Sequence, residues 1–323
     1  MAQFLQVTIS GLATGAIFAI AAVGFALLWQ TAGAVNFAHG EFVMLPAVLI
    51  LTLGTLEPTI GIPDFVPLIG GANVGFALPA AGVPWGLLIG AALTIPIVIF
   101  LLGYVFKRVL VDRLLEVGGD DIPLVIATIG LALFMREYVR EAWFATPQGF
   151  PSVFGDQVWR PSGVAITADD VGVIVVGTVV ILGLQVFIKR TYLGRQMQAA
   201  AQNAETATVL GIPVNRMVML TFAINAVLVT VAALLVSPTI NARWDAGINL
   251  GLFAFTAAII GGFNQVRGAL FGGFLVGLLQ NWSGFYVSSL YREAGPLILM
   301  IVVILFRPQG LFGRAEELSL IHI

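Results

Sequence analysis

Residues Phe4 to Trp29 form a run of 26 positions without one charged side chain, and this run constrains the fold more than any other feature. About 20 apolar residues are enough to span a bilayer. The rest of the chain is similar, because 59% of its residues are hydrophobic, 10% are charged and its mean hydropathy is +1.00. Soluble domains seldom exceed half apolar residues. The sequence therefore predicts an integral membrane protein. Its first run lacks the basic start of a signal peptide and is expected to remain as a helix.

Further apolar stretches follow along the whole chain. Because several of them are short, we expect eight or nine spans. The expected helices cover residues 4–29, 40–56, 85–106, 122–144, 171–188, 217–237, 249–263, 268–288 and 294–306. The predicted fold class is all-α, a polytopic transmembrane helix bundle with broken helices.

Basic residues are concentrated in three connections between these stretches, and such clusters favour the cytoplasmic side. They are Lys107, Arg108 and Arg113, then Lys189, Arg190, Arg195 and Arg216, and finally Arg307 and Arg314. The alternate connections, 57–84, 145–170 and 238–248, carry mostly acidic residues and are expected outside. This parity predicts an N-terminus outside and a C-terminus inside.

The stretch Asn36-Phe37-Ala38-His39-Gly40-Glu41 places an amide, an imidazole and a carboxylate between two apolar runs. Ionisable groups at membrane depth are costly unless they face a protein interior, a water-filled cavity or a partner. Asn36, His39, Gly40 and Glu41 are therefore candidates for a translocation pathway. The alternative is a tight polar turn at the membrane surface, in which Asn36 caps the following helix.

A second interruption, Gly261 to Gly268, breaks the apolar run near the other end of the chain. Broken helices at matching positions in two halves point to the central pathway of a transporter, and this makes Asn264 a further pathway candidate. A glycine-rich cytoplasmic hairpin with Arg267 at the lipid headgroups explains the same residues. The glycine pairs Gly11/Gly15 and Gly273/Gly277 predict close helix packing without implying chemistry.

Residues 190–216 contain an alanine-rich stretch of good helix propensity, which Gly211 and Pro213 are expected to end. A short helix between two spans on the cytoplasmic side is what a permease needs to receive the motion of a partner. Any surface helix shows the same pattern, so this stretch alone does not identify a function.

Three separated motifs in order make the assignment more specific. They are the Asn36–Glu41 stretch, the alanine-rich segment with Gly194, Arg195, Ala199, Ala201, Ala207, Gly211 and Ile212, and the ending Phe306-Arg307-Pro308-Gln309-Gly310-Leu311-Phe312-Gly313. Together they resemble the permease subunit of branched-chain amino-acid ABC importers, over residues 5 to 314. The resemblance implies one permease domain, 1–314, in a bacterial inner membrane. Residues 315–323 match no family ending, and a cloning or assembly remnant is one interpretation.

In that family the alanine-rich segment resembles the coupling helix that docks on the ATPase, and the seven residues named for it are the expected coupling residues. Glu205 stands where the wider ABC pattern usually has glycine. The resemblance implies four further partners: two ATP-binding cassette ATPase subunits, a second, paralogous permease and an extracytoplasmic solute-binding protein. Whether the chain pairs with itself or with a paralogue stays open. Membrane lipid surrounds the bundle.

Other chemistry receives little support from the residues. His39-Gly40-Glu41 has the H-x-E form of zinc deaminases, but their cysteine ligands are missing because the chain has no cysteine. A Walker A sequence is absent from the chain, so ATP hydrolysis requires a partner. A net charge of −2 argues against nucleic acid, and no cofactor or enzymatic activity is expected. Two alternatives remain: the same architecture importing urea or short amides, and an ion-coupled secondary carrier that uses Glu41 or His39.

Overall fold

The computed structural model describes residues 1–32, 36–53, 85–116, 121–142, 146–155, 157–263 and 265–313. These residues do not include Asn264, the connection 57–84, Arg314 or the tail 315–323.

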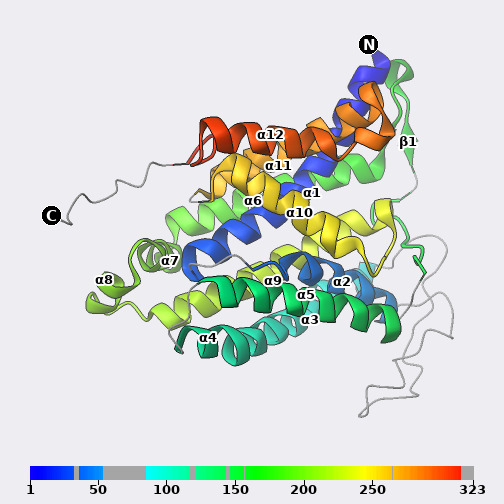
Figure 1. Ribbon diagram of the computed structural model, residues 1–323. Coiled ribbons are helices and arrows are strands. Elements are labelled where there is room, and N and C mark those ends of the chain that lie inside the picture. Colours follow the sequence, from blue (N-terminus) through cyan, green and yellow to red (C-terminus); the bar gives the residue numbers. More distant parts are fainter. Residues whose placement is uncertain are drawn as a thin grey trace.

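The described residues form a bundle of helices (Figure 1). The α-helices are α1 (Ala2–Ala32), α2 (His39–Leu53), α3 (Trp85–Phe106), α4 (Asp112–Glu116), α5 (Asp121–Ala142), α6 (Ala168–Arg190), α7 (Tyr192–Gln202), α8 (Ala204–Val209), α9 (Val214–Ile240), α10 (Ala246–Gly261), α11 (Val266–Trp282) and α12 (Ala294–Phe306). Short π and 3-10 segments are η1 (Lys107–Val111), η2 (Pro161–Gly163), η3 (Ser283–Val287) and η4 (Ser289–Tyr291). One small antiparallel hairpin pairs β1 (Val158–Trp159) with β2 (Ile166–Thr167).

Each of the nine expected helices has a counterpart among these elements. Six segments of the described chain are long and apolar enough to cross a membrane, whereas α2 and α10 are apolar but shorter. The chain is therefore a polytopic all-α membrane protein. The prediction of one short helix in residues 190–216 is wrong. The chain forms two helices there, α7 and α8, which meet at Asn203.

Helix α1 lies at the centre of the bundle. Its most apolar window is 89% buried, against 17% for α5 and 11% for the segment that contains α12. It packs most extensively against α11 and also contacts α6, α9 and α10. The weakly buried helices carry many exposed Leu, Ile, Val and Phe side chains, as expected for surfaces that face lipid.

Glycines make the central packing possible. A methyl group at Gly15 of α1 would lie 2.8 Å from the Phe274 Cα of α11, and one at Gly277 would collide with the backbone of Gly15. The close packing predicted at Gly11/Gly15 and at Gly273/Gly277 is confirmed, and the structure shows that the two pairs face each other. Backbones approach this closely only where side chains are absent.

The two ends of the bundle differ in composition. The ends of α3, α6 and α12 and the start of α9 lie at one end, with α7 and α8 beyond them (Figure 1). The three basic connections therefore share one end, where Lys107 donates hydrogen bonds to Asp112 (2.8 Å) and Asn215 (3.0 Å). We call this the basic end.

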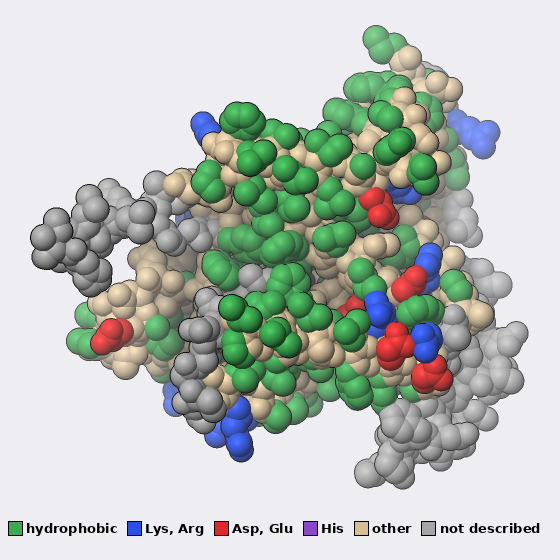
Figure 2. Space-filling model, viewed as in Figure 1, with side chains coloured by type: hydrophobic (Ala, Val, Ile, Leu, Met, Phe, Trp, Pro, Cys, Tyr) green, Lys and Arg blue, Asp and Glu red, His purple; other side chains and the backbone are tan. Residues whose placement is uncertain are grey.

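The opposite end carries the N-terminus, the β1–β2 hairpin and the connection between α9 and α10. Ion pairs at this end join Arg140 to Glu137 and Arg243 to Asp245, both at 2.7 Å. Figure 2 shows hydrophobic side chains over the middle of one face and charged side chains of both signs gathered toward this end.

Candidate functional site: a polar junction, a cavity and a connecting segment

The start of α2, with Asn36 before it, lies inside the bundle, and we call residues 36–41 the polar junction. Asn36 caps α2, since its Oδ1 accepts a hydrogen bond from the Ala38 N–H at 3.0 Å and its carbonyl accepts one from His39 N–H at 3.1 Å. The capping prediction is therefore confirmed. The His39 ring contacts the carbonyl of Ala21, and Ala21 lies 11 residues before the end of α1 at Ala32. At 1.5 Å per residue this is about 16 Å inward along α1, so the junction is recessed.

His39 is fully buried between α1 and α9. Its Nε2 atom lies 3.1 Å from the Ala21 carbonyl, and its Nδ1 atom lies 3.4 Å from the Asn225 amide nitrogen. A carbonyl only accepts, so we assign the ring proton to Nε2, and Nδ1 then accepts from Asn225. The Phe25 ring covers the imidazole at 4.2 Å between centroids. His39 of α2 thus links α1 and α9, two helices far apart in sequence, through two buried hydrogen bonds.

Glu41 is 3% exposed at the contact between α2 and α10. Among the described residues its Oε2 atom has no hydrogen-bond partner. The charges of Arg136 and Asp245 act on its carboxylate. The contact is tight, because a side chain on Gly40 or Gly247 would meet the backbone or carboxylate of the other helix. A buried acid with an unused oxygen is costly and therefore marks this position as a functional candidate.

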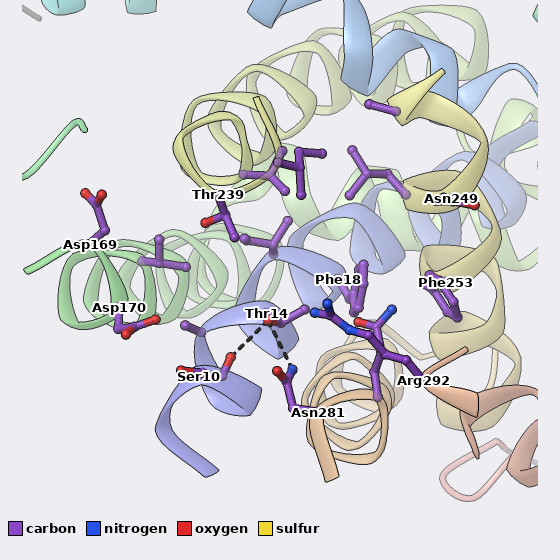
Figure 3. A pocket seen from close by; sticks show the side chains of 18 of the residues that line it. Ser10, Thr14, Phe18, Asp169, Asp170, Thr239, Asn249, Phe253, Asn281 and Arg292 are labelled. Carbon is purple, nitrogen blue, oxygen red and sulfur yellow. Dashed lines mark hydrogen bonds between the residues drawn. The ribbon is translucent and has the colours of Figure 1, made fainter. Parts of the chain in front are cut away.

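A cavity of about 530 Å³ opens at the end of the bundle opposite the basic end (Figure 3). It descends along α1 from Ser10 to Phe18, which corresponds to about 12 Å at 1.5 Å per residue. Its floor is the ring pair Phe18 and Phe253, with centroids 5.4 Å apart. The polar and charged lining residues are Ser10, Thr14, Thr167, Asp169, Asp170, Thr239, Arg243, Asp245, Asn249, Gln280, Asn281, Arg292 and Glu293.

Helix α10 separates this cavity from Glu41. Asn249 and Phe253 line the cavity, at positions one turn apart. Gly247 and Gly251 lie on another face of the same helix and contact α2 beside Gly40. Glu41 and the cavity therefore lie on two different sides of α10.

The connecting segment, residues 191–213, stands at the basic end. Thr191 caps α7 by accepting from the Gly194 N–H at 3.0 Å, and Asn203 caps α8 by accepting from the Thr206 N–H at 2.8 Å. Gly211 ends α8 with a φ of 80°, a conformation that favours glycine. Four large hydrophobic side chains of the segment are exposed: Tyr192, Leu193, Val209 and Leu210.

The expected coupling residues have different environments. Gly194 and Ala207 are buried, and a side chain at Gly194 would collide with the backbone of Ile188. Arg195 and Gly211 are exposed, while Ala199, Ala201 and Ile212 are half-buried. The small residues therefore let α7 and α8 pack on α6 and α9, and the exposed apolar residues provide the surface.

The expected pathway residues are brought together only in part. Asn36, His39, Gly40 and Glu41 form one junction, whereas Asn264 lies outside the described residues. The described residues on either side of Asn264 lie at the basic end, where the Gly261 carbonyl accepts from the Phe312 N–H at 3.2 Å. The sequence analysis missed Asn225 and the cavity. Single polar residues inside apolar helices, such as Asn225 and Gln280, were the available signal.

A bundle of apolar helices with a recessed polar junction and a cavity is an arrangement expected of a polytopic transport protein. The chain belongs to the family described as "Branched-chain amino acid transport system / permease component", whose model matches residues 7–306.

The chain is 32% identical to the high-affinity branched-chain amino acid transport system permease protein BraD of Pseudomonas aeruginosa, over 97% of each chain. It is 29% identical to LivH of Escherichia coli K12, a permease protein of the same description, over 97% of this chain and 96% of LivH. The autoinducer 2 import system permease protein LsrD of Salmonella paratyphi B is 25% identical over 86% of this chain and 82% of LsrD. These relatives are transport permeases and not enzymes.

One solved structure, PsaBC from Streptococcus pneumoniae in complex with Fab, contains a chain that is similar to this one. The match covers 94% of this chain and 90% of that chain. Its TM-score is 0.46 at 15% identity.

Proposed function

We propose that this chain is the transmembrane permease subunit of an ATP-driven ABC importer and forms the translocation pathway for branched-chain amino acids. Family membership supports the permease role, and the names of BraD and LivH support the substrate. The bundle then lies in a bacterial inner membrane with eight or nine spans. The basic end faces the cytoplasm and the cavity faces outside, in accordance with the preference of Lys and Arg for the cytoplasmic side.

The observation that carries the ATP-driven part is the connecting segment. It stands beyond the spans at the basic end and exposes Leu193, Val209 and Leu210. Exposed apolar residues on the two short, capped helices α7 and α8 provide a docking surface for a partner protein. We assign this surface to two ATPase subunits, one on this chain and one on a second permease. A solute-binding protein delivers the substrate at the cavity end.

The docking assignment is tested by purifying the tagged chain in mild detergent and identifying its partners by mass spectrometry. We expect a Walker-motif ATPase and a second permease. Replacing Val209 and Leu210 together by Ser is expected to remove the ATPase, because the apolar contact area is lost. The matched control is Val209→Ile with Leu210→Met, which keeps the surface apolar. Equal ATPase recovery from both variants would contradict the assignment.

A second candidate function, an ion-coupled secondary carrier, has one specific observation in its favour. Glu41 is buried beside α10 with an unused oxygen, as a proton-accepting carboxylate in a carrier is expected to be. The purified chain alone, reconstituted in vesicles, distinguishes the two. Leucine uptake driven by an ion gradient without ATPase would establish the carrier. Uptake that requires ATP and the added subunits supports the importer.

The substrate is tested in the same assembled system. LsrD shows that the related permeases include one named for a different cargo. Competition of labelled leucine uptake by isoleucine and valine is expected, whereas competition by urea or acetamide alone would assign the chain to the urea and short-amide importers.

A further inference from the structure

The cavity between α1, α6, α9, α10 and α11 contains both charged groups and an apolar floor (Figure 3). We propose that it is a binding site within the permease for a zwitterionic amino acid with an aliphatic side chain, held by Arg292 and by the Phe18–Phe253 floor. This inference rests on the proposed function for its substrate class and adds a site. Ligand cavities typically occupy about 300–1,000 Å³, and the cavity volume of about 530 Å³ lies in this range.

Most charged groups at the cavity already have partners. Arg243 and Asp245 form an ion pair at 2.7 Å. Asp169 accepts hydrogen bonds from Ser152 Oγ at 2.9 Å and from the Phe154 N–H at 3.2 Å. These groups line the rim of the cavity, and their charges are largely compensated by partners within the protein.

Arg292 differs from them. Within the described part of the chain its guanidinium group makes no ion pair and no hydrogen bond, although its backbone carbonyl accepts from Ser283 Oγ at 3.1 Å. Figure 3 shows its side chain extending from the segment before α12 toward Thr14 and Phe18 of α1. A guanidinium group binds a carboxylate through two parallel N–H donors. Arg292 is therefore placed to hold the carboxylate of a ligand above the floor.

Two further groups complete the match. Gln280 is 7% exposed, and its amide has no hydrogen-bond partner among the described residues, so it offers an acceptor from the α11 wall. Asp170 adds a carboxylate on the α6 side, and its Oδ2 atom accepts from Thr167 Oγ1 at 2.8 Å. The ammonium group of the ligand faces the amide oxygen of Gln280 and this carboxylate. Below them Phe18, Leu250 and Phe253 form an apolar surface for an alkyl side chain. A zwitterion with a short aliphatic side chain satisfies all three regions.

The absence of cysteine from the chain provides a direct assay, because one introduced cysteine is its only thiol. Asn249 lines the cavity and is exposed, so Asn249→Cys is expected to react with a membrane-impermeant methanethiosulfonate reagent. Thr146→Cys is the control, since it is exposed but does not line the cavity. Both full-length variants are assembled with their partner subunits in nucleotide-free membranes that have been washed free of binding protein.

Leucine is expected to protect the cysteine at position 249 and not the one at 146. Leucinamide, which lacks the carboxylate, and glycine, which lacks the alkyl group, are each expected to require about tenfold higher concentrations. Adding Arg292→Gln is expected to raise the half-protecting concentration of leucine about tenfold, and leucine then approaches leucinamide. Arg307→Gln, an exposed arginine at the basic end, should change nothing.

The results separate the two proposals. Equal protection by leucine and leucinamide, protection unaffected by Arg292→Gln, or no protection by leucine would overturn the cavity assignment. ATP-dependent leucine uptake by the same complex would leave the importer function standing. Protection by urea or acetamide instead of leucine would overturn the zwitterion site, and the same result in the uptake assay would overturn the proposed substrate.

Discussion

Adding one methyl group at Gly15 tests the central packing of the bundle. The Cβ atom of Gly15→Ala would lie 2.8 Å from Phe274 Cα and 3.1 Å from the Phe274 carbonyl oxygen. Carbon atoms in contact are usually about 3.5–4.0 Å apart. Helices α1 and α11 must therefore separate locally by about 1 Å, because the obstructing atoms are backbone and cannot rotate away.

The expected cost follows from that separation. A gap of about 0.5–1 Å removes a quarter to a half of the dispersion energy of the affected atom pairs. Overpacking of a close-packed core typically costs about 1–3 kcal/mol, and we expect Gly15→Ala to lower the free energy of unfolding by this amount. Gly130→Ala is the matched control, since nothing lies within 4 Å of its added methyl group. Alanine is the better helix former by about 1 kcal/mol, so the control should be stabilised.

The assay is reversible unfolding of the purified chain in detergent, with helix content followed by circular dichroism. The two variants carry the same chemical change and should move in opposite directions. A Gly15→Ala protein as stable as the wild type, or one stabilised as much as Gly130→Ala, would refute the close-packing argument.

Three other changes have defined outcomes. Lys107→Met removes the buried donor of the hydrogen bonds to Asp112 and Asn215, so we expect a loss of about 1–3 kcal/mol in the free energy of unfolding, whereas Arg108→Met, at a side chain 70% exposed, should change it little. The hydrogen bond from Arg243 lowers the pKa of Asp245 below its ordinary value of 3.8. The stability that this pair contributes is therefore present above pH 3.8 and is lost as the pH falls further. The difference in thermal midpoint between the wild type and Asp245→Asn should shrink in acid. Glu41→Gln keeps the side-chain volume but removes the buried charge, and we expect reduced leucine uptake with unchanged recovery of partner subunits; normal uptake would exclude a pathway role.

Long apolar runs made the helices predictable, because the bilayer thickness sets their length and the composition reports it directly. The break at Asn203 was not predicted, since alanine-rich residues on both sides favour one continuous helix. The asparagine side chain instead accepts from the Thr206 N–H and starts a second helix. Asparagine is among the best residues for this capping position, so a local signal was present.

Only the α2 residues of the polar junction were predictable from the sequence, and their partner on α9 was not. The Asn36–Glu41 stretch is recognisable because its polar residues are adjacent in sequence. Asn225, the partner of His39, lies 186 residues away and is one amide in an apolar helix. The cavity has no local signal either, since its walls come from five helices and its existence depends on where α10 begins.

The short length of α10 explains how these features are connected. With 16 residues α10 is about 24 Å long, less than the roughly 30 Å of a hydrocarbon core, and its first residue, Ala246, lines the cavity together with Asn249 and Phe253. Its other end, at the basic end, is held by the C-terminal segment, because Leu311 N–H donates to the Ile260 carbonyl at 2.8 Å. Gly247 lets the same helix touch the backbone of α2 beside Glu41. A displacement of α10 by motion at the basic end must therefore change the cavity and the surroundings of Glu41 together.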